Sequence, residues 1–260
     1  MLLRRVIAHF RRQEWTAIAL DFFIVVTGVF IGIQVSNWNA ARADEARARA
    51  YLERIVADLD ADLAALADRQ EFWRAVSVYG AQGLEYAQTG AAGDASHWEL
   101  LLAYFQASQV AEHVPVQATY DELKSAGDLE LISDLEVRNA LARYYNFSGA
   151  GTVVERPAYR VHVRGVIPLE IQTYIWDSCY ASDPFGEQRM FECPSPADEA
   201  RVREIVDAVA TDASLMAELR YWMSTMHVAL LIEKNRTASA TTLKQKIAAR
   251  LPGMPGSAQP

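Results

Sequence analysis

Two hydrophobic patterns meet near Trp38. Residues 15–38 read WTAIALDFFIVVTGVFIGIQVSNW, an apolar run with a tryptophan at each end and a single charged residue, Asp21. A hydrocarbon core of about 30 Å is crossed by roughly 20 apolar residues in a helix, and tryptophan is enriched at both membrane interfaces. The pattern therefore predicts one transmembrane helix over residues 15–38.

Beyond Trp38 the apolar residues recur at spacings of three and four, the period of a helix with one buried face. In residues 40–86, which contain no proline, this stripe comprises Leu52, Ile55, Leu59, Leu63, Leu66, Trp73 and Val76. Because no turn residue follows Trp38, we expect the membrane helix to continue into the domain as one long rod. Asp62 and Arg69 fall on the seam that a dimeric coiled coil would use, so the stripe is expected to pack within the domain instead.

Capping and turn residues predict a series of further helices. Ser96 is expected to cap one of them after a loop over residues 89–95. Pro115 is expected to begin another, which ends at Gly127 because glycine suits the left-handed position after a helix. A capping box that starts at Ser133 predicts a third.

Residues 153–176 fit two patterns. Their apolar and polar residues alternate in part, as in a strand, and they also match the spacing of a helix. A single strand would have no pairing neighbour, so we expect a helix that is disturbed near Pro157 and Pro168.

The last part of the chain completes a helical design. Ser195 and Pro196 are typical of a helix start, and residues 212–250 predict one or two final helices. The expected fold class is all-α, with one transmembrane helix that continues into a long-helix bundle. The expected parts are a short cytoplasmic segment (1–14), the span (15–38), a periplasmic helical domain (39–250) with a disulfide loop at about 177–195, and a disordered tail (251–260).

Positive charge precedes the predicted span. The first 12 residues hold four arginines and no acid (Arg4, Arg5, Arg11 and Arg12), whereas residues 42–74 hold six arginines and eight acids. The positive-inside rule therefore predicts a cytoplasmic N-terminus and a domain on the opposite side of the membrane. A cleaved signal peptide is the alternative, but its apolar core has about 7 to 15 residues. This run is longer and ends in the bulky, polar sequence SNWN.

One face of the predicted span combines small residues with an acid. The stripe follows steps of four and three and consists of Asp21, Val25, Gly28, Gly32 and Val35. A G-x-x-x-G pair lets two helix backbones approach closely, and an acid within a membrane indicates a partner or a proton site. We expect this face to associate with a second copy of the chain or with another envelope protein. The alternatives are an incidental glycine pair and a carboxyl group that is protonated or reaches the headgroups.

The run GVFIGIQVSNWN, followed by a charged helix, resembles the start of an uncharacterised family of single-span bacterial membrane proteins. Members have an acid early in the span and a G-x-x-I-x-x-Q-x-x-N-W-N signature at its outer end, which maps to Asp21, Gly28, Ile31, Gln34, Asn37, Trp38 and Asn39. A second resembling stretch covers residues 118–145. The resemblance implies single-span topology and an all-helical fold, and it carries over no catalytic residue. The segment between Cys179 and Cys193 departs from the family pattern.

Composition limits the chemistry that the chain can perform. Its formal net charge is −8, and because residues 1–38 carry +2, the remainder carries −10. Such a surface argues against a nucleic-acid partner, which requires a basic footprint. The histidines show no H-x-x-x-H or H-E-x-x-H spacing, and neither G-x-S-x-G nor a glycine-rich phosphate loop occurs. We therefore expect no metal, no cofactor and no enzymatic activity.

Two cysteines, Cys179 and Cys193, lie 14 positions apart in a segment rich in Pro, Gly, Asp and Ser. In an oxidising compartment this pattern predicts one disulfide that closes a loop. A metal site is the alternative, but the closest histidines in the sequence, His162 and His227, are distant.

One basic feature stands out in the acidic domain. Arg156, Arg160 and Arg164 repeat every four residues, which places three guanidinium groups on one helical face. Such a stripe is a candidate contact for a carboxylate or a phosphate. Salt bridges to the many neighbouring acids are the commoner explanation, and the one we favour from the sequence.

These patterns indicate a location and a fold more than an activity. The leading expectation is a non-enzymatic inner-membrane protein whose periplasmic domain works through partners. With about 14 residues before the span, any signal would pass to another chain. The alternative is a bundle resembling chemoreceptor-type sensor domains, which senses a small anionic ligand through the arginine stripe. Two close carboxylates with raised pKa values in a cleft would instead indicate a hydrolase.

Overall fold

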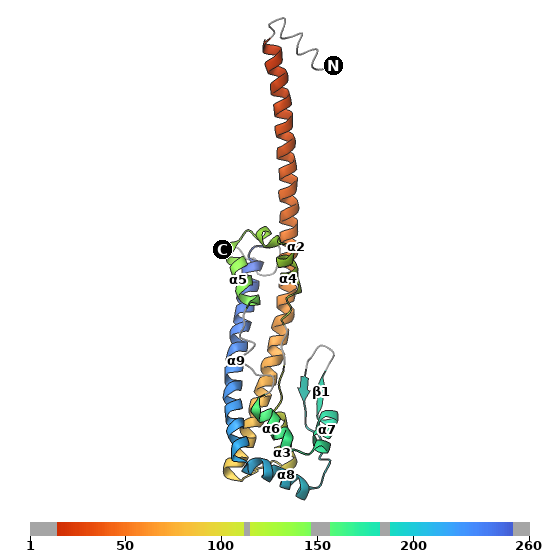
Figure 1. Ribbon diagram of the computed structural model, residues 1–260, viewed down its shortest axis with the longest axis vertical. Coiled ribbons are helices and arrows are strands. Elements are labelled where there is room, and N and C mark those ends of the chain that lie inside the picture. The colour runs from red at the N-terminus through yellow and green to blue at the C-terminus, as the bar shows by residue number, and fades with distance from the viewer. Residues whose placement is uncertain (1–14, 112–114, 147–156, 183–187, 252–260) are drawn as a thin grey trace.

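The computed structural model describes residues 15–111, 115–146, 157–182 and 188–251 (Figure 1). Its elements are α2 (Trp15–Thr89), α3 (His97–Gln106), α4 (Ala118–Ser125), the 3-10 helix η1 (Asp128–Leu131), α5 (Leu135–Tyr145), α6 (Ala158–Val166), α7 (Leu169–Ser178), β1 (Tyr180–Ser182), β2 (Gln188–Met190), α8 (Glu199–Thr211) and α9 (Ala213–Ala248). The expected all-α class is confirmed, since the strands in these ranges are two short ones.

Helix α2 is an unbroken rod of 75 residues, as the absence of a turn after Trp38 predicted. Its apolar first part projects beyond the rest of the molecule, and its second part runs through the bundle (Figure 1). The helix ends at Thr89, before a loop in which Gly90 and Gly93 adopt positive φ angles of 68° and 60°. Glycine adopts this backbone conformation without a steric penalty.

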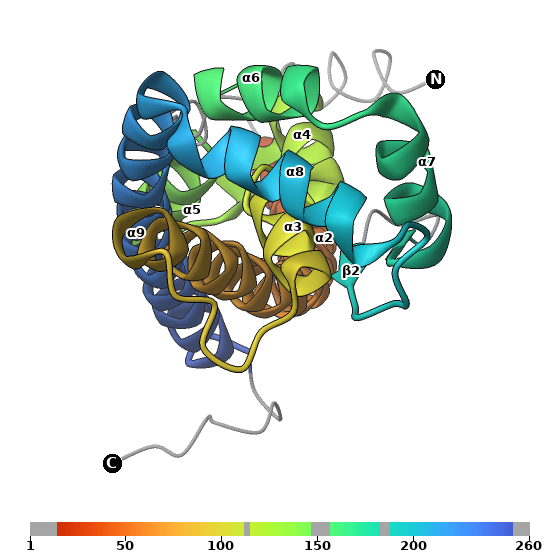
Figure 2. The ribbon, with the colours of Figure 1, turned by 90° about the horizontal axis from the view of Figure 1, so that it is seen from below.

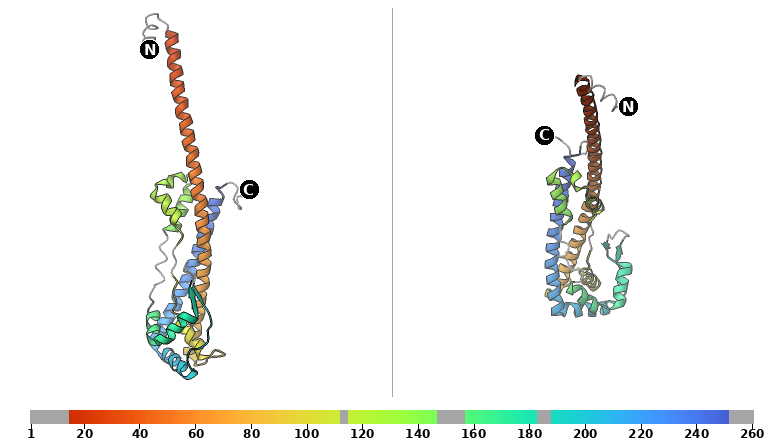
Figure 3. Two further views of the ribbon diagram at one scale, coloured as in Figure 1. Left: turned by 90° about the vertical axis from the view of Figure 1, so that its right-hand side faces the viewer. Right: turned by 45° about the horizontal axis from the view of Figure 1, so that its top comes forward.

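Helix α9 is the antiparallel partner of α2 and packs along its bundle half (Figures 1 and 2). The Asp212 carboxylate caps α9 by accepting a hydrogen bond from the Leu215 amide. Helix α8 crosses the end of the bundle that is farthest from the apolar segment, and α4 and α5 lie at the near end (Figures 1 and 3). The segments around α3, α6 and α7 surround the far end.

Two hydrophobic cores lie one above the other in this bundle. The distal core, far from the apolar segment of α2, includes Trp73, Tyr104, Phe105, Tyr159 and Trp222. The proximal core, near that segment, includes Ile55, Leu59, Leu123, Leu141 and Leu243. Both cores take one wall from α2 and one from α9, because these two helices run the full height of the bundle.

A buried polar layer separates the two cores along α2 and α9. It consists of Asp62, Arg69, Glu233 and Arg236, each at most 8% exposed. Asp62 and Arg69 were expected to disfavour a dimeric coiled coil, so that the α2 stripe would pack within the domain. Both side chains face the interior of the domain.

Hydrogen bonds and an ion pair contact the charged side chains of this layer. The Asp62 carboxylate accepts hydrogen bonds from the Val116 amide at 2.8 Å and from the Tyr144 hydroxyl at 2.7 Å. Nε of Arg69 lies 2.9 Å from Oε1 of Glu233. Burial raises the pKa of Glu233 and lowers that of Arg69, because a poorly solvated site disfavours each charged form.

Several helix starts differ from the expected positions. Asp134, and not Ser133, caps α5, because its carboxylate accepts from the amides of Glu136 and Val137. Asp198 caps α8, so the predicted start at Ser195 and Pro196 is wrong. In both cases an aspartate, which caps as well as serine does, lies closer to the first helical residue.

Other local predictions agree more closely. Ser96 and Glu99 form a full capping box at the start of α3. Helix α4 begins at Ala118 rather than Pro115, and Gly127 follows it with φ of 75°. At the C-terminal end, Leu251 was expected in a disordered tail, but it is 3% exposed and packs in the proximal core. The rest of that tail lies outside the described residues.

The region expected as a disturbed helix forms two helices. Pro157 and Pro168 stand immediately before α6 and α7, where a missing amide hydrogen costs nothing. Residues 153–156 lie outside the described part of the chain. The hairpin of β1 and β2, which pairs Ala181 with Arg189, was not expected.

Candidate functional site

The apolar segment of α2 is the first candidate surface. Its large side chains are mostly half to two-thirds exposed, as in Phe22 at 70%, although they would normally be buried in a core. The helix is long and apolar enough to cross a membrane, and none of its most apolar stretch is buried within the protein. The guanidinium of Arg42 stacks 4.2 Å from the Trp38 ring centroid, at the end where the polar half begins.

The predicted association face lies on this exposed segment. Asp21, Val25, Gly28, Gly32 and Val35 share one side of a continuous helix, since no kink interrupts α2. A Cβ atom built at either glycine would meet nothing within 4 Å. Among the described residues the face is therefore open to a neighbouring helix, and the structure does not identify a partner.

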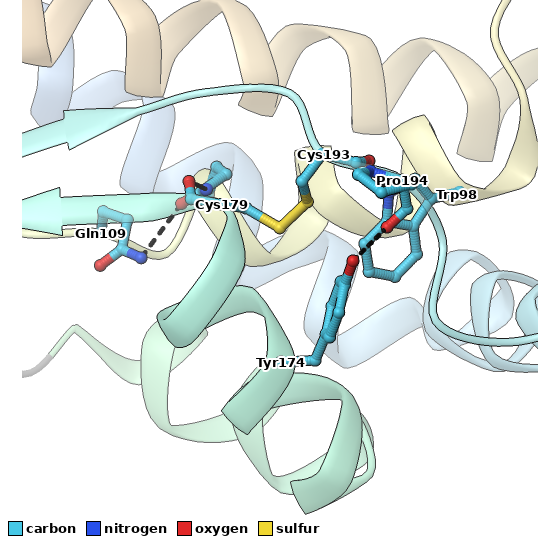
Figure 4. Close-up of a disulfide and its surroundings, with 7 residues drawn as sticks. Trp98, Gln109, Tyr174, Cys179, Cys193 and Pro194 are labelled. Carbon is cyan, nitrogen blue, oxygen red and sulfur yellow. Dashed lines mark hydrogen bonds between the residues drawn. A yellow bond between two sulfur atoms is a disulfide. The ribbon is translucent and has the colours of Figure 1, made fainter.

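A disulfide joins Cys179 at the end of α7 to Cys193 after the hairpin, the pairing that the two-cysteine count indicated. Figure 4 shows how neighbouring side chains hold the bridge in place. Nε1 of Trp98 donates to the Cys193 carbonyl at 2.7 Å, and the Tyr174 hydroxyl donates to the Pro194 carbonyl at 2.9 Å. The bridge thus ties the hairpin to both α7 and α3.

The structure brings two of the three stripe arginines together, and Arg156 lies outside the described residues. On α6, Nη1 of Arg160 donates to the Ser108 carbonyl at 2.7 Å. Nε of Arg164 donates to the Ser108 hydroxyl at 3.0 Å, and its Nη2 donates to Oε1 of Gln109 at 3.1 Å. Among the described residues no carboxylate pairs with Arg160 or Arg164, so the favoured explanation, salt bridging to acids, stays a prediction for this stripe.

Two aromatic rings contact one of these guanidinium groups. Arg164 lies 4.8 Å from the Phe105 ring centroid and 5.0 Å from that of Trp176, and these two rings pack edge to face with centroids 5.4 Å apart. Burial, and then the positive charge of Arg160, lowers the pKa of Arg164 to about 9. Burial also lowers the pKa of Arg160. We refer to Arg160 and Arg164 as the arginine pair.

A chain of buried amides connects the arginine pair to the disulfide. Gln109, which accepts from Arg164, donates from Nε2 to Oε1 of Gln106 at 3.1 Å. Nε2 of Gln106 in turn donates to the Cys179 carbonyl at 3.3 Å. Sequence patterns alone do not reveal Gln106, Ser108 and Gln109, because polar residues at the end of an apolar helix look like the start of an ordinary solvated loop. All three are at most 1% exposed.

A pocket of about 420 Å³ beside the disulfide tests the hydrolase alternative. Ser96, Glu99, Glu192 and Cys193 are among its lining residues. The hydrogen bonds of the Glu99 carboxylate to the amide and hydroxyl of Ser96 lower its pKa. A general acid needs the opposite shift, so Glu99 does not meet the criterion of a raised pKa.

Two described histidines contact carboxylates. Nδ1 of His162 lies 3.1 Å from a carboxylate oxygen of Glu218, and His97 contacts Glu199. The described residues contain no group of three or more His, Cys, Asp or Glu side chains that could hold a metal ion.

Comparisons with protein-family models, with curated proteins and with solved structures find no match. The resemblance to single-span bacterial proteins therefore stays a prediction, and functional inference rests on the geometry of the chain.

Proposed function

We propose that the chain is a single-pass inner-membrane protein that works by binding partners with a periplasmic helical bundle. The observation that carries this proposal is the division of one helix into two environments. The first part of α2 exposes a continuous apolar surface, and its second part builds both cores of the bundle. A lipid bilayer is the solvent that suits the first part, because water disfavours an apolar surface of that extent.

Charge supports the orientation in this proposal. Four arginines precede the span, and the far side of the span carries the acidic remainder of the chain. The positive-inside rule assigns the arginine side to the cytoplasm. The Cys179–Cys193 disulfide agrees with a periplasmic bundle, since structural disulfides persist in oxidising compartments.

The span also supplies the proposed means of association. Its open face of Gly28 and Gly32 would let a second helix approach closely, and Asp21 would contribute a polar contact on the same side. The partner is a second copy of the chain or another envelope protein.

Photo-crosslinking in intact membranes tests this association. A benzophenone amino acid placed at Val25 or Val35 lies on the face, and the same group at Phe23 or Phe30 lies on the opposite side of α2. We expect ultraviolet-dependent adducts from the first two positions and few from the second two, with mass spectrometry identifying the partner. Equal adducts from all four positions, or none from Val25 and Val35, would contradict the proposed face.

The arginine pair favours a second candidate function, a sensor for a small anion. Two adjacent guanidinium groups without a described acidic partner are typical of a site that binds a carboxylate or a phosphate. In this version of the proposal the bundle binds a ligand at its distal end, and α2 connects that end to the membrane.

A further inference from the structure

We infer that Arg160 and Arg164 form a binding site for a small oxyanion that carries two negative charges. This inference rests on the sensor version of the proposed function and specifies the class of its ligand. The site lies where α6, the end of α3 and the base of the hairpin meet, at the bundle end far from the span (Figure 3).

The arginine pair has no acidic partner among the described residues, although the chain is rich in acids. Of the 260 residues, 33 are acidic and 25 are lysine or arginine, so acids are available throughout the chain. Other described arginines use them: Arg54 pairs with Glu122, Arg69 with Glu233 and Arg250 with Asp134. The arginine pair instead contacts the neutral groups of Ser108 and Gln109. Two half-buried positive charges near each other are thus left without a described counter-charge, which a dianion would supply.

The arginine pair has more N–H donors than its described contacts use. A guanidinium group has five N–H donors in a planar fork that matches the oxygens of a carboxylate or a phosphate. The described contacts use Nη1 of Arg160 and Nε and Nη2 of Arg164. Three nitrogen atoms have no partner among the described residues: Nε and Nη2 of Arg160 and Nη1 of Arg164. None of the three is among the fully buried side-chain atoms that lack a hydrogen-bond partner. They are the donors that remain for a ligand.

The Arg164 guanidinium is already held in place by its neighbours. The rings of Phe105 and Trp176 contact it, and buried Ser108 and Gln109 accept hydrogen bonds from it. The Trp176 ring in turn packs against Tyr180, with ring centroids 4.7 Å apart. Side chains that are already held in place lose less conformational entropy when a ligand binds.

Tyr180 lies beside the site, because its ring packs against Trp176, which contacts Arg164. Burial raises the pKa of Tyr180, and the charges of Arg160 and Arg164 act in the opposite direction, so its hydroxyl lies in the field of both arginines. Tyr180 follows Cys179 directly, and the Cys179 carbonyl accepts from Gln106. The disulfide therefore anchors the strand that carries Tyr180.

A purely structural role makes a different prediction. The carbonyl end of α3 carries a partial negative charge, which the arginine pair neutralises by donating to Ser108. If that were the whole role, removing an arginine would destabilise the bundle and anions would have no saturable effect. The two explanations therefore differ in ligand binding.

Isothermal titration calorimetry on the full-length protein in detergent tests the inference. Inorganic phosphate and succinate are the two dianionic probes, which distinguish a phosphate source from a dicarboxylate source. Acetate at matched ionic strength is the monoanionic control. We expect saturable one-to-one binding of at least one dianion and no saturable binding of acetate. Loss of a charged hydrogen bond in Arg160→Gln or Arg164→Gln should weaken binding about tenfold or more.

Two further variants keep the test interpretable. Arg201→Gln, on α8, removes an exposed arginine that pairs with Glu204 and should bind like the parent protein. Arg164→Lys keeps the charge without the fork and should bind with intermediate affinity. The absence of saturable dianion binding to the parent, or unchanged binding by a folded Arg160→Gln variant, would overturn the inference. Because this experiment does not depend on membrane topology or on a protein partner, its failure would leave the membrane-anchored proposal standing.

Discussion

At the scale of residues, the polar layer shows that a buried polar atom does not always have a hydrogen-bond partner. Both oxygens of Asp62 have donors. In contrast, Oε2 of Glu233, Nη1 of Arg69 and Nε of Arg236 are buried without a described partner. Buried ion pairs of this kind contribute little net stability, and in some proteins they specify which residues face each other. We expect the layer to fix the register of α2 against α9.

Replacing Asp62 should be costly because two buried donors would lose their acceptor. We predict that Asp62→Ala lowers the free energy of unfolding by about 2–4 kcal/mol, since each unsatisfied buried group costs about 1–3 kcal/mol. Urea unfolding followed by circular dichroism measures the change. Asp60→Ala, two positions away on α2, is the matched control. Its partner Lys244 is partly exposed, so the loss should be below about 1 kcal/mol. Equal losses in both variants would contradict the assigned role.

Two glycines should respond to alanine with opposite signs. Gly127 has φ of 75°, a conformation that costs an alanine about 1–2 kcal/mol. Gly165 lies within α6, and a Cβ there would meet nothing within 4 Å. We therefore predict that Gly127→Ala destabilises the protein and that Gly165→Ala stabilises it by about 0.5 kcal/mol. Thermal unfolding of the two variants side by side shows whether the signs differ as expected.

The cap of α5 should make stability depend on pH. Hydrogen bonds from the Val137 amide and from Arg250 lower the pKa of Asp134 below its usual value. A lowered acid pKa adds stability above the unfolded-state value, and this stability is lost as the pH falls through the folded-state value. Asparagine also caps helices but does not titrate. Between about pH 5 and pH 3, the parent should therefore lose more stability than Asp134→Asn. Parallel pH profiles for the two proteins would count against this assignment.

At the scale of elements, the sequence predicted those helices whose extent follows from the hydrophobic period and from capping or turn residues. The long α2 rod follows from its spacing and from the lack of a turn after Trp38, and the Ser96 cap follows from its capping box. Cap positions at Asp134 and Asp198 were missed by one to three residues, because several capping residues occur together there. The hairpin was missed because strands of three residues are too short to show alternation.

The disulfide should stabilise the segment that carries the hairpin. Closing a loop of about 15 residues contributes about 3 kcal/mol in the chain-entropy description. We predict that a Cys179→Ala, Cys193→Ala double variant loses stability of that order in urea unfolding. Dithiothreitol should lower the stability of the parent and leave the double variant unchanged. A loss below about 0.5 kcal/mol would show that the packing of Trp98 and Tyr174 holds the segment without the bridge.

At the scale of the whole molecule, the contacts that define the candidate site could not be predicted from the sequence. The four-residue spacing placed Arg160 and Arg164 on one face, but it could not show that Ser108 and Gln109 meet them from a distant part of the chain. The Arg69–Glu233 contact likewise depends on the antiparallel packing of α2 and α9. Tertiary packing, rather than the local sequence pattern, determines which described residues contact the arginine pair, and no acid is among them.

The central claim is that one helix crosses the inner membrane and enters a bundle on its periplasmic side. Alkaline phosphatase folds to an active enzyme only outside the cytoplasm, so its activity in carbonate-washed membranes, when fused behind Pro260, tests this claim most directly. Our account predicts high activity that stays in the membrane pellet. An inactive fusion in the pellet, or active enzyme released into the carbonate supernatant, would contradict it.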